Sequence, residues 1–116
     1  YVRSQSKAHG LTNKIEGEIS SNQNVVVIED LISSGKSSLD AVKALQEINC
    51  NVIGMGAIFS YGFDIAKENF NNANCKLFTL TNYDTLIEIA VESKYITQEN
   101  LTSLSNWRKS PETWKK

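Results

Sequence analysis

Residues 24–38 read NVVVIEDLISSGKSS, and this stretch decides the fold that we predict for the chain. Four apolar residues, Val25–Ile28, lead into Glu29 and Asp30, and a polar turn follows two residues later. A continuous apolar run bounded by turn residues is typical of a strand that is buried on both faces of a parallel sheet. The stretch therefore predicts an α/β fold organised around this strand.

The turn after the predicted strand joins small residues to the start of a helix. Ser33–Ser38 contains four serines, a glycine and a lysine, and apolar residues recur at helical spacing from Leu39 onward. We expect Ser37 or Ser38 to cap this helix. The first N–H groups of a helix have no acceptor within it and point toward one spot, which favours a phosphate. Together with the two acids, the turn predicts a sugar-phosphate site at the carboxyl end of the strand.

Strands alternate with helices in the rest of the chain. This alternation predicts right-handed crossovers in a parallel sheet and a single domain over residues 1–116. In the helix that Thr81 and Asn82 introduce, we expect Leu86, Ile89, Ala90 and Tyr83 to face the core. The other expected strands lie at 15–19, 51–61 and 76–80, and the other expected helices lie at 39–49, at 64–72 and from Thr97 onward.

Composition excludes several classes of protein. Apolar residues make up 41% of the 116 residues, charged residues make up 22%, and the formal net charge is −1. This balance argues against a chain that coats nucleic acid or an anionic membrane surface. No apolar run approaches the roughly 20 residues of a membrane span, so we expect a cytoplasmic location. Cys50 and Cys75 are expected to be free thiols, although their number alone would permit a disulfide.

The sequence SSGKSS invites comparison with the phosphate loop of nucleotide hydrolases. That motif needs G-x-x-x-x-G-K-[ST], and Asp30 stands where its first glycine should be. A carboxylate at this position would repel the phosphates that the loop encloses. The pattern therefore disfavours a nucleotide hydrolase.

The segment VVVIEDLISSGKS resembles the signature for phosphoribosyl pyrophosphate (PRPP) of the type I phosphoribosyltransferases. Four further segments, in this order along the chain, resemble the bacterial orotate phosphoribosyltransferases: YVRSQSKAHGLTNKIEG, AIFSYGF, LFTLTNYDTL and WRKSPETW. The resemblance covers essentially the whole chain. It implies the Rossmann-like, parallel-sheet fold of that family, with the family's N-terminal part missing here.

The resemblance implies an enzyme of pyrimidine biosynthesis. It would transfer 5-phosphoribosyl from PRPP to orotate, with Mg²⁺ bound mainly through PRPP, and it would work as a homodimer. Because part of the family's orotate pocket comes from the N-terminal region, activity of residues 1–116 alone stays open. Two alternatives also stay open: another phosphoribosyltransferase, and a PRPP-binding regulator without catalysis on the same fold.

The resemblance also implies roles for individual residues. A mobile loop at 4–14 would place Arg3, Lys7 and His9 near the pyrophosphate in the neighbouring subunit. Lys7 and His9 would be catalytic together with Asp30. A PRPP loop at 29–37 would include Ser33, which would also contact orotate. The blander alternatives are a solvated basic loop and acids that only face water. The PRPP-binding residues implied are Arg3, Lys7, His9, Glu29, Asp30, Leu31, Ile32, Ser33, Ser34, Gly35, Lys36 and Ser37.

Overall fold

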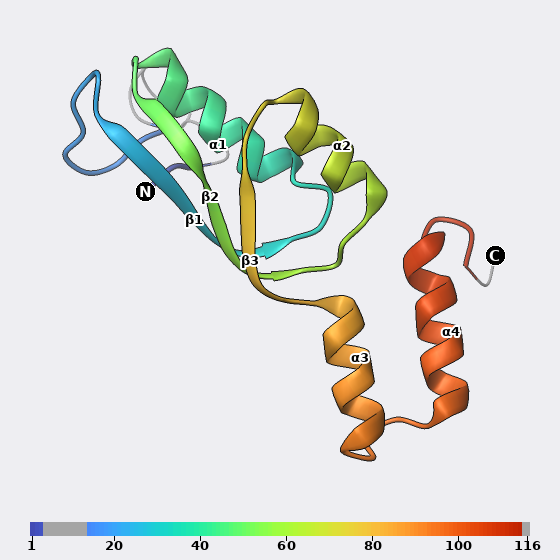
Figure 1. Ribbon diagram of the computed structural model, residues 1–116. Helices are drawn as coiled ribbons and strands as arrows, with labels where there is room; N and C mark the ends of the chain where they lie inside the picture. The colour runs from blue at the N-terminus through green and yellow to red at the C-terminus, as the bar shows by residue number, and fades with distance from the viewer. Residues whose placement is uncertain (4–13, 115–116) are drawn as a thin grey trace.

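A three-stranded parallel sheet forms the centre of the molecule, as the alternation of strands and helices predicted (Figure 1). The structure is a computed structural model that describes residues 1–3 and 14–114. The strands lie in the order β1-β2-β3, and two more helices follow the sheet. The elements are β1 (Asn24–Ile32), α1 (Lys36–Glu47), β2 (Asn51–Ser60), α2 (Asp64–Asn72), β3 (Leu77–Asn82), α3 (Tyr83–Glu92) and α4 (Gln98–Lys109).

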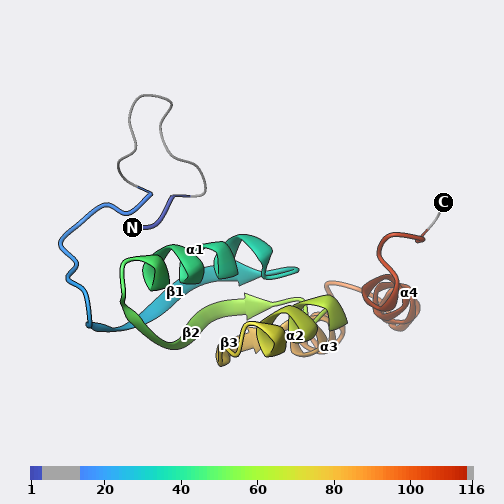
Figure 2. The same ribbon diagram turned by 90° about the horizontal axis from the view of Figure 1, so that it is seen from above.

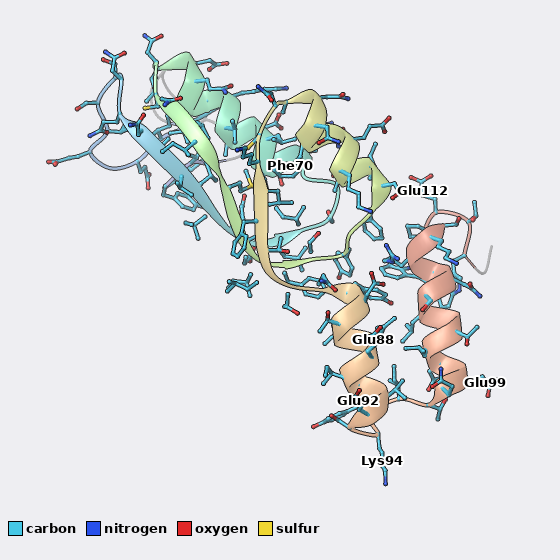
Figure 3. The ribbon with its side chains drawn as sticks, viewed as in Figure 1. Phe70, Glu88, Glu92, Lys94, Glu99 and Glu112 are labelled. Carbon is cyan, nitrogen blue, oxygen red and sulfur yellow. The ribbon has the colours of Figure 1, made fainter. Side chains whose placement is uncertain are left out.

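Helices α1 and α2 cover one face of the sheet and form the core with it. Both crossovers run in the same direction along the sheet, which places both helices on the same side. Phe70 of α2 lies between its helix and the sheet (Figure 3). The buried cluster consists of Ile32, Leu39, Val42, Met55, Ala57, Ala66 and Phe70.

The opposite face of the sheet is bare among the described residues, so the prediction of a strand buried on both faces is wrong here. Side chains alternate along each strand, and those that point away from α1 and α2 are apolar as well. Ile28 is 76% exposed and Leu80 is 73% exposed. A continuous apolar run specifies two apolar faces, but it does not specify what covers the second one. The bare face comprises Val26, Ile28, Ile58, Phe78 and Leu80.

Helices α3 and α4 extend beyond the end of the sheet, away from α1 (Figures 1 and 2). Asn82 caps α3 as expected, because its side chain accepts a hydrogen bond from the Thr85 N–H at 3.0 Å. Tyr83 is buried as expected, but the rest of the expected inward face of α3 is wrong, since Leu86 and Ile89 are about half exposed while Ile87 is buried. Since α3 packs mainly against α4 and not on the sheet, its buried stripe is rotated from the expected one.

Other local predictions have mixed outcomes. Residues 64–72 form α2 with the expected bounds, and Thr97 caps α4 through a reciprocal pair of hydrogen bonds with Asn100. The expected strand at 15–19 is wrong, because only Ile15 forms a bridge, to Val2. Cys50 and Cys75 are free thiols, as expected. In the part of the chain that the structure describes, every helix is too short or too polar to span a membrane.

The joint between α3 and α4 depends on Tyr83, whose hydroxyl donates a hydrogen bond to the Leu104 carbonyl at 3.3 Å. We expect Tyr83→Phe to lower the free energy of unfolding by about 1 kcal/mol, the usual value of one such bond. Burial raises the pKa of the Tyr83 hydroxyl above 10.0. The stabilisation linked to this group is therefore complete below pH 10 and decreases at higher pH. Urea unfolding between pH 8 and 11 checks both points, and Tyr95→Phe, at an exposed tyrosine, is the control.

Candidate functional site

The serine loop, residues 33–37, joins the end of β1 to the start of α1. Helix α1 begins at Lys36, and its N-cap is Gly35 with a φ of 76° and no capping side chain. The prediction of Ser37 or Ser38 as the cap is therefore wrong; Ser38 is buried in the first turn. Because no side chain caps the helix, its first amides are left for an anion, apart from a long contact of 3.4 Å between the Lys36 N–H and Ser34 Oγ.

The serine loop is held close to the core by α2. Asn69 donates a hydrogen bond from Nδ2 to the Ser34 carbonyl oxygen at 2.9 Å. A Cβ atom placed on Gly35 would lie 2.4 Å from Cε2 of Phe70. Position 35 therefore requires glycine for two reasons, its positive φ and its close approach to Phe70.

The two acids lie inside β1 and not after its end, because the strand runs on to Ile32. Successive side chains of a strand point to opposite faces. Glu29 is half-buried on the face of α1, whereas Asp30 is exposed on the bare side. Asp30 Oδ1 accepts a hydrogen bond from the Leu31 N–H at 2.7 Å, and neither acid forms an ion pair with any described residue.

The basic residues predicted near the N-terminus are only partly described. Arg3 donates to Glu16 from Nε at 3.0 Å and also from Nη2, so its guanidinium is engaged by a neighbouring segment. Residues 1–3 lie well apart from the serine loop in both views (Figures 1 and 2). The predicted PRPP contact of Arg3 is with the neighbouring subunit, so it stays a prediction. Lys7, His9 and most of the loop 4–14 lie outside the described residues.

A cavity of about 660 Å³ opens beside the serine loop. Three segments that are distant in sequence line it: the serines of the loop, the turn and first residues of α2, and the C-terminal end of α4 with the residues after it. Glu112 on the last segment lies close to the start of α2 (Figure 3). Apart from Ser33 and Ser34, the lining residues were not predicted: Gly62, Phe63, Asp64, Ile65, Lys67, Arg108, Lys109, Ser110, Pro111, Glu112 and Thr113.

Arg108 connects the end of α4 to the turn after β2 and to α3. Its Nη1 donates to the Gly62 carbonyl oxygen at 3.1 Å, and its Nη2 lies 3.3 Å from Asp84 Oδ1. The Nε atom is buried and has no hydrogen-bond partner. Trp107, the preceding residue, packs within 6 Å between ring centroids on three other aromatic residues. These are Tyr61, Phe63 and Tyr83.

A sequence signal for this part of the site did exist. Both Trp107 and Arg108 belong to WRKSPETW, and both Tyr61 and Phe63 belong to AIFSYGF. The two segments contributed to the family resemblance, yet neither received a role, because no local pattern shows that they meet. For metals, the described residues contain no group of three or more His, Cys, Asp or Glu side chains that could hold an ion.

Comparison with known proteins gives a consistent result. A protein of Porphyromonas gingivalis is 54% identical over 114 residues, which are 98% of this chain and 54% of that protein. A protein of Listeria innocua is 53% identical over 116 residues, which are 100% of this chain and 56% of that protein. Both relatives are named orotate phosphoribosyltransferase. The chain thus spans about half the length of the curated relatives that it matches, and no protein-family model matches it.

Solved structures agree with the fold. Orotate phosphoribosyltransferase of Mycobacterium tuberculosis, in complex with Fe(III) dicitrate, is 31% identical with a TM-score of 0.60 over 70% of this chain and 46% of that one. UMP synthase of Leishmania donovani, at 23% identity, has a TM-score of 0.72 over 82% of this chain and 21% of that one. The type I phosphoribosyltransferase fold and the resemblance to orotate phosphoribosyltransferases are therefore confirmed.

Proposed function

Because this chain is homologous along its whole length to orotate phosphoribosyltransferases, we propose that it is the PRPP-binding part of such an enzyme. The whole protein would transfer 5-phosphoribosyl from PRPP to orotate, forming orotidine 5'-phosphate and pyrophosphate, in the synthesis of UMP in the cytoplasm. One observation is the main support for the proposal. A relative with this name is 54% identical along nearly the whole chain, in an alignment that spans the serine loop.

The serine loop binds the 5-phosphate of PRPP in this proposal. The uncapped amides at the start of α1 are suited to a phosphate, and Gly35 allows the ligand to approach the backbone closely. Lys36 opens the helix and is exposed, so it adds a positive charge without shaping the loop. Ser33 and Ser34 lie between this phosphate site and the cavity.

The acids bind the ribose hydroxyls. Asp30 is the main ligand, since it is exposed and, among the described residues, accepts a hydrogen bond only from the adjacent Leu31 N–H. Glu29 acts from the other face of the strand, close to its end. A nitrogen of orotate attacks the anomeric carbon, the bond from that carbon to pyrophosphate breaks, and the orotate proton goes to solvent. Positive charge that develops on the ribose is stabilised by these carboxylates.

A magnesium ion fits the residues present. Mg²⁺ is usually held by one or two carboxylates together with substrate phosphates, and Asp30 supplies one exposed carboxylate near the phosphate loop. When bound, the ion neutralises charge on the leaving pyrophosphate. We assign the same task to Lys7 and His9, which lie outside the described residues.

Binding and transfer assays test the function. We expect PRPP with Mg²⁺ to raise the melting temperature of the chain, because a ligand at 100 times its Kd adds about 2.7 kcal/mol of stability. Transfer is assayed in the protein restored to the length of its relatives, with orotate, uracil and adenine as acceptors. Transfer to adenine or uracil would identify another phosphoribosyltransferase. PRPP binding without any transfer would identify a regulator.

The proposed enzyme is a homodimer in which each subunit's loop 4–14 completes the site of its partner. We expect full-length Lys7→Ala and Asp30→Asn proteins each to be nearly inactive alone. After mixing and reassembly, about a quarter of the wild-type activity should return, because half of the dimers are mixed and one of their two sites is intact. No recovery despite proven subunit exchange would mean that the loop acts on its own subunit.

A further inference from the structure

Helix α2 contacts the serine loop through two consecutive residues, Asn69 and Phe70. Asn69 donates from Nδ2 to the Ser34 carbonyl oxygen at 2.9 Å, and the Phe70 ring lies directly beside Gly35. Phe70 is only 4% exposed and belongs to the buried cluster, so the helix that provides both contacts is anchored in the core. The peptide unit between Ser34 and Gly35 is therefore fixed from the side of α2.

The hydrogen bond from Asn69 sets the direction of this peptide unit. No peptide bond among the described residues is cis, and the C=O and N–H groups of a trans peptide point in opposite directions. Because the Ser34 carbonyl oxygen points toward α2, the Gly35 N–H points away from it. Among the described residues, no acceptor is hydrogen-bonded to this N–H. Asn69 thus directs an unpaired donor away from α2, beside the uncapped amides at the start of α1.

The opposite orientation of the peptide unit would work against phosphate binding. A rotation of this unit would replace the N–H donor by the Ser34 carbonyl oxygen, and an oxygen acceptor repels a phosphate. Gly35 has no Cβ, so its backbone tolerates more conformations than that of other residues, and glycine alone does not select one orientation. The hydrogen bond from Asn69 supplies that selection.

Helix formation does not explain an asparagine at position 69. The residue lies inside α2, where asparagine is less favourable than alanine because its side chain competes for backbone hydrogen bonds. Asn69 is half-buried, and its amide group can donate to a carbonyl oxygen, which an aspartate of the same shape cannot do. The residue type therefore matches the contact with the serine loop and not the needs of the helix.

We propose that Asn69 is a positioning residue for the 5-phosphate of PRPP, which it orients through the Ser34–Gly35 peptide unit without touching the substrate. The inference rests on the proposed function and deepens it by one residue outside the serine loop. A donor that is oriented before the ligand arrives binds more tightly, since no binding free energy is used to orient it. Loss of the Asn69 amide should therefore weaken binding at the 5-phosphate and leave the rest of the PRPP site unchanged.

The test uses the protein restored to the length of its relatives, with ribose 5-phosphate and pyrophosphate as separate calorimetric probes of the two ends of the PRPP site. Asn69→Asp keeps the shape of the side chain but replaces the donor by an acceptor oxygen. We expect it to raise the Kd of ribose 5-phosphate about 10-fold to 100-fold, the range of one hydrogen bond to a charged group. The Kd of pyrophosphate should change by less than about 2-fold, and kcat at saturating PRPP by less than about 3-fold, because the 5-phosphate takes no part in bond breaking.

The matched control is Asn72→Asp. Asn72 is exposed in α2 three residues after Asn69, so the change in net charge is the same and lies one helical turn away. Because exposed charges are screened by salt, this variant should keep the Kd of ribose 5-phosphate within about 2-fold of the wild-type value. An equal loss in both variants would attribute the effect to charge alone and would overturn the proposal.

Two further outcomes would also overturn it. One is an unchanged Kd of ribose 5-phosphate in Asn69→Asp. The other is an equal loss of affinity for ribose 5-phosphate and pyrophosphate together with a lower melting temperature, since Asn69 would then only stabilise the fold. Should Asn69→Asp fail to fold, Asn69→Ala decides by the same two criteria, because alanine is the best helix former. A wild-type protein that binds neither PRPP nor ribose 5-phosphate would instead refute the proposed function.

Discussion

Gly35→Ala should lower the free energy of unfolding by about 2–5 kcal/mol and abolish measurable PRPP binding. The left-handed φ of 76° costs an L-residue about 1–2 kcal/mol. The new Cβ would also lie 2.4 Å from Phe70 Cε2, and overpacking of this kind costs about 1–3 kcal/mol. To relieve this clash, either Phe70 in the core or the serine loop must shift. Urea unfolding and calorimetric titration with PRPP measure the two losses.

Gly17→Ala separates the two causes. Gly17 also has a positive φ, of 112°, but a Cβ there meets no atom within 4 Å. It should therefore show the backbone cost without the clash, and equal losses at both glycines would contradict the packing explanation. Lys36→Ala is the control for the phosphate. It should weaken PRPP binding far less than Gly35→Ala, because the proposed ligands are backbone amides.

Asp30→Asn should reduce phosphoribosyl transfer by the full-length protein by about 100-fold to 1000-fold, the range found for one lost electrostatic contact to a transition state. The change keeps the size of the side chain and removes its charge. Stability should change by less than about 1 kcal/mol, because the side chain is exposed and its hydrogen bond is to the neighbouring residue. The assay compares kcat with orotate and PRPP, alongside urea unfolding.

An equivalent substitution away from the site is available in α1. Asp40 is exposed there, and Asp40→Asn should leave transfer unchanged while altering the net charge by the same amount. Glu29→Gln should act in the same direction as Asp30→Asn, though less strongly, since Glu29 is half-buried on the other face of β1. Unchanged turnover in both Asp30→Asn and Glu29→Gln would refute the assignment of these two acids to the ribose hydroxyls.

Local sequence patterns predicted the order of the strands and helices, but they did not predict what packs against each element. Val25–Ile28 predicted a parallel strand, and the turn after it predicted the start of a helix, because both signals lie within a few residues. The burial of Val26 and Ile28 depends on whatever covers the second face of the sheet, which local sequence does not encode. The expected inward positions of Leu86 and Ile89 in α3 were wrong for the same reason, since they depend on packing against α4.

The same distinction applies to the candidate site, where local patterns predicted the serine loop but not the contacts between distant residues. The serine loop was predicted in place, since its residues are consecutive. The Ser37 or Ser38 cap failed because Gly35 can adopt a left-handed φ that starts the helix earlier. The PRPP contact of Arg3 was predicted from family resemblance alone and stays a prediction, because it concerns the neighbouring subunit; within the chain, Arg3 donates to Glu16. The cavity brings together Ser33 and Arg108, which are 75 positions apart in the sequence, and no spacing rule anticipates this.

The contact between Arg108 and Gly62 has a consequence for biosynthesis. The two residues are 46 positions apart, and the segment that closes the cavity leaves the ribosome after every other part of its wall. Protein synthesis adds about 5–20 residues per second, so the sheet and the serine loop precede this closure by several seconds. During that interval a nascent chain has its serine loop but no finished cavity beside it. The cavity is therefore completed late in the synthesis of each molecule, and a chain that ended after α3 would never form it.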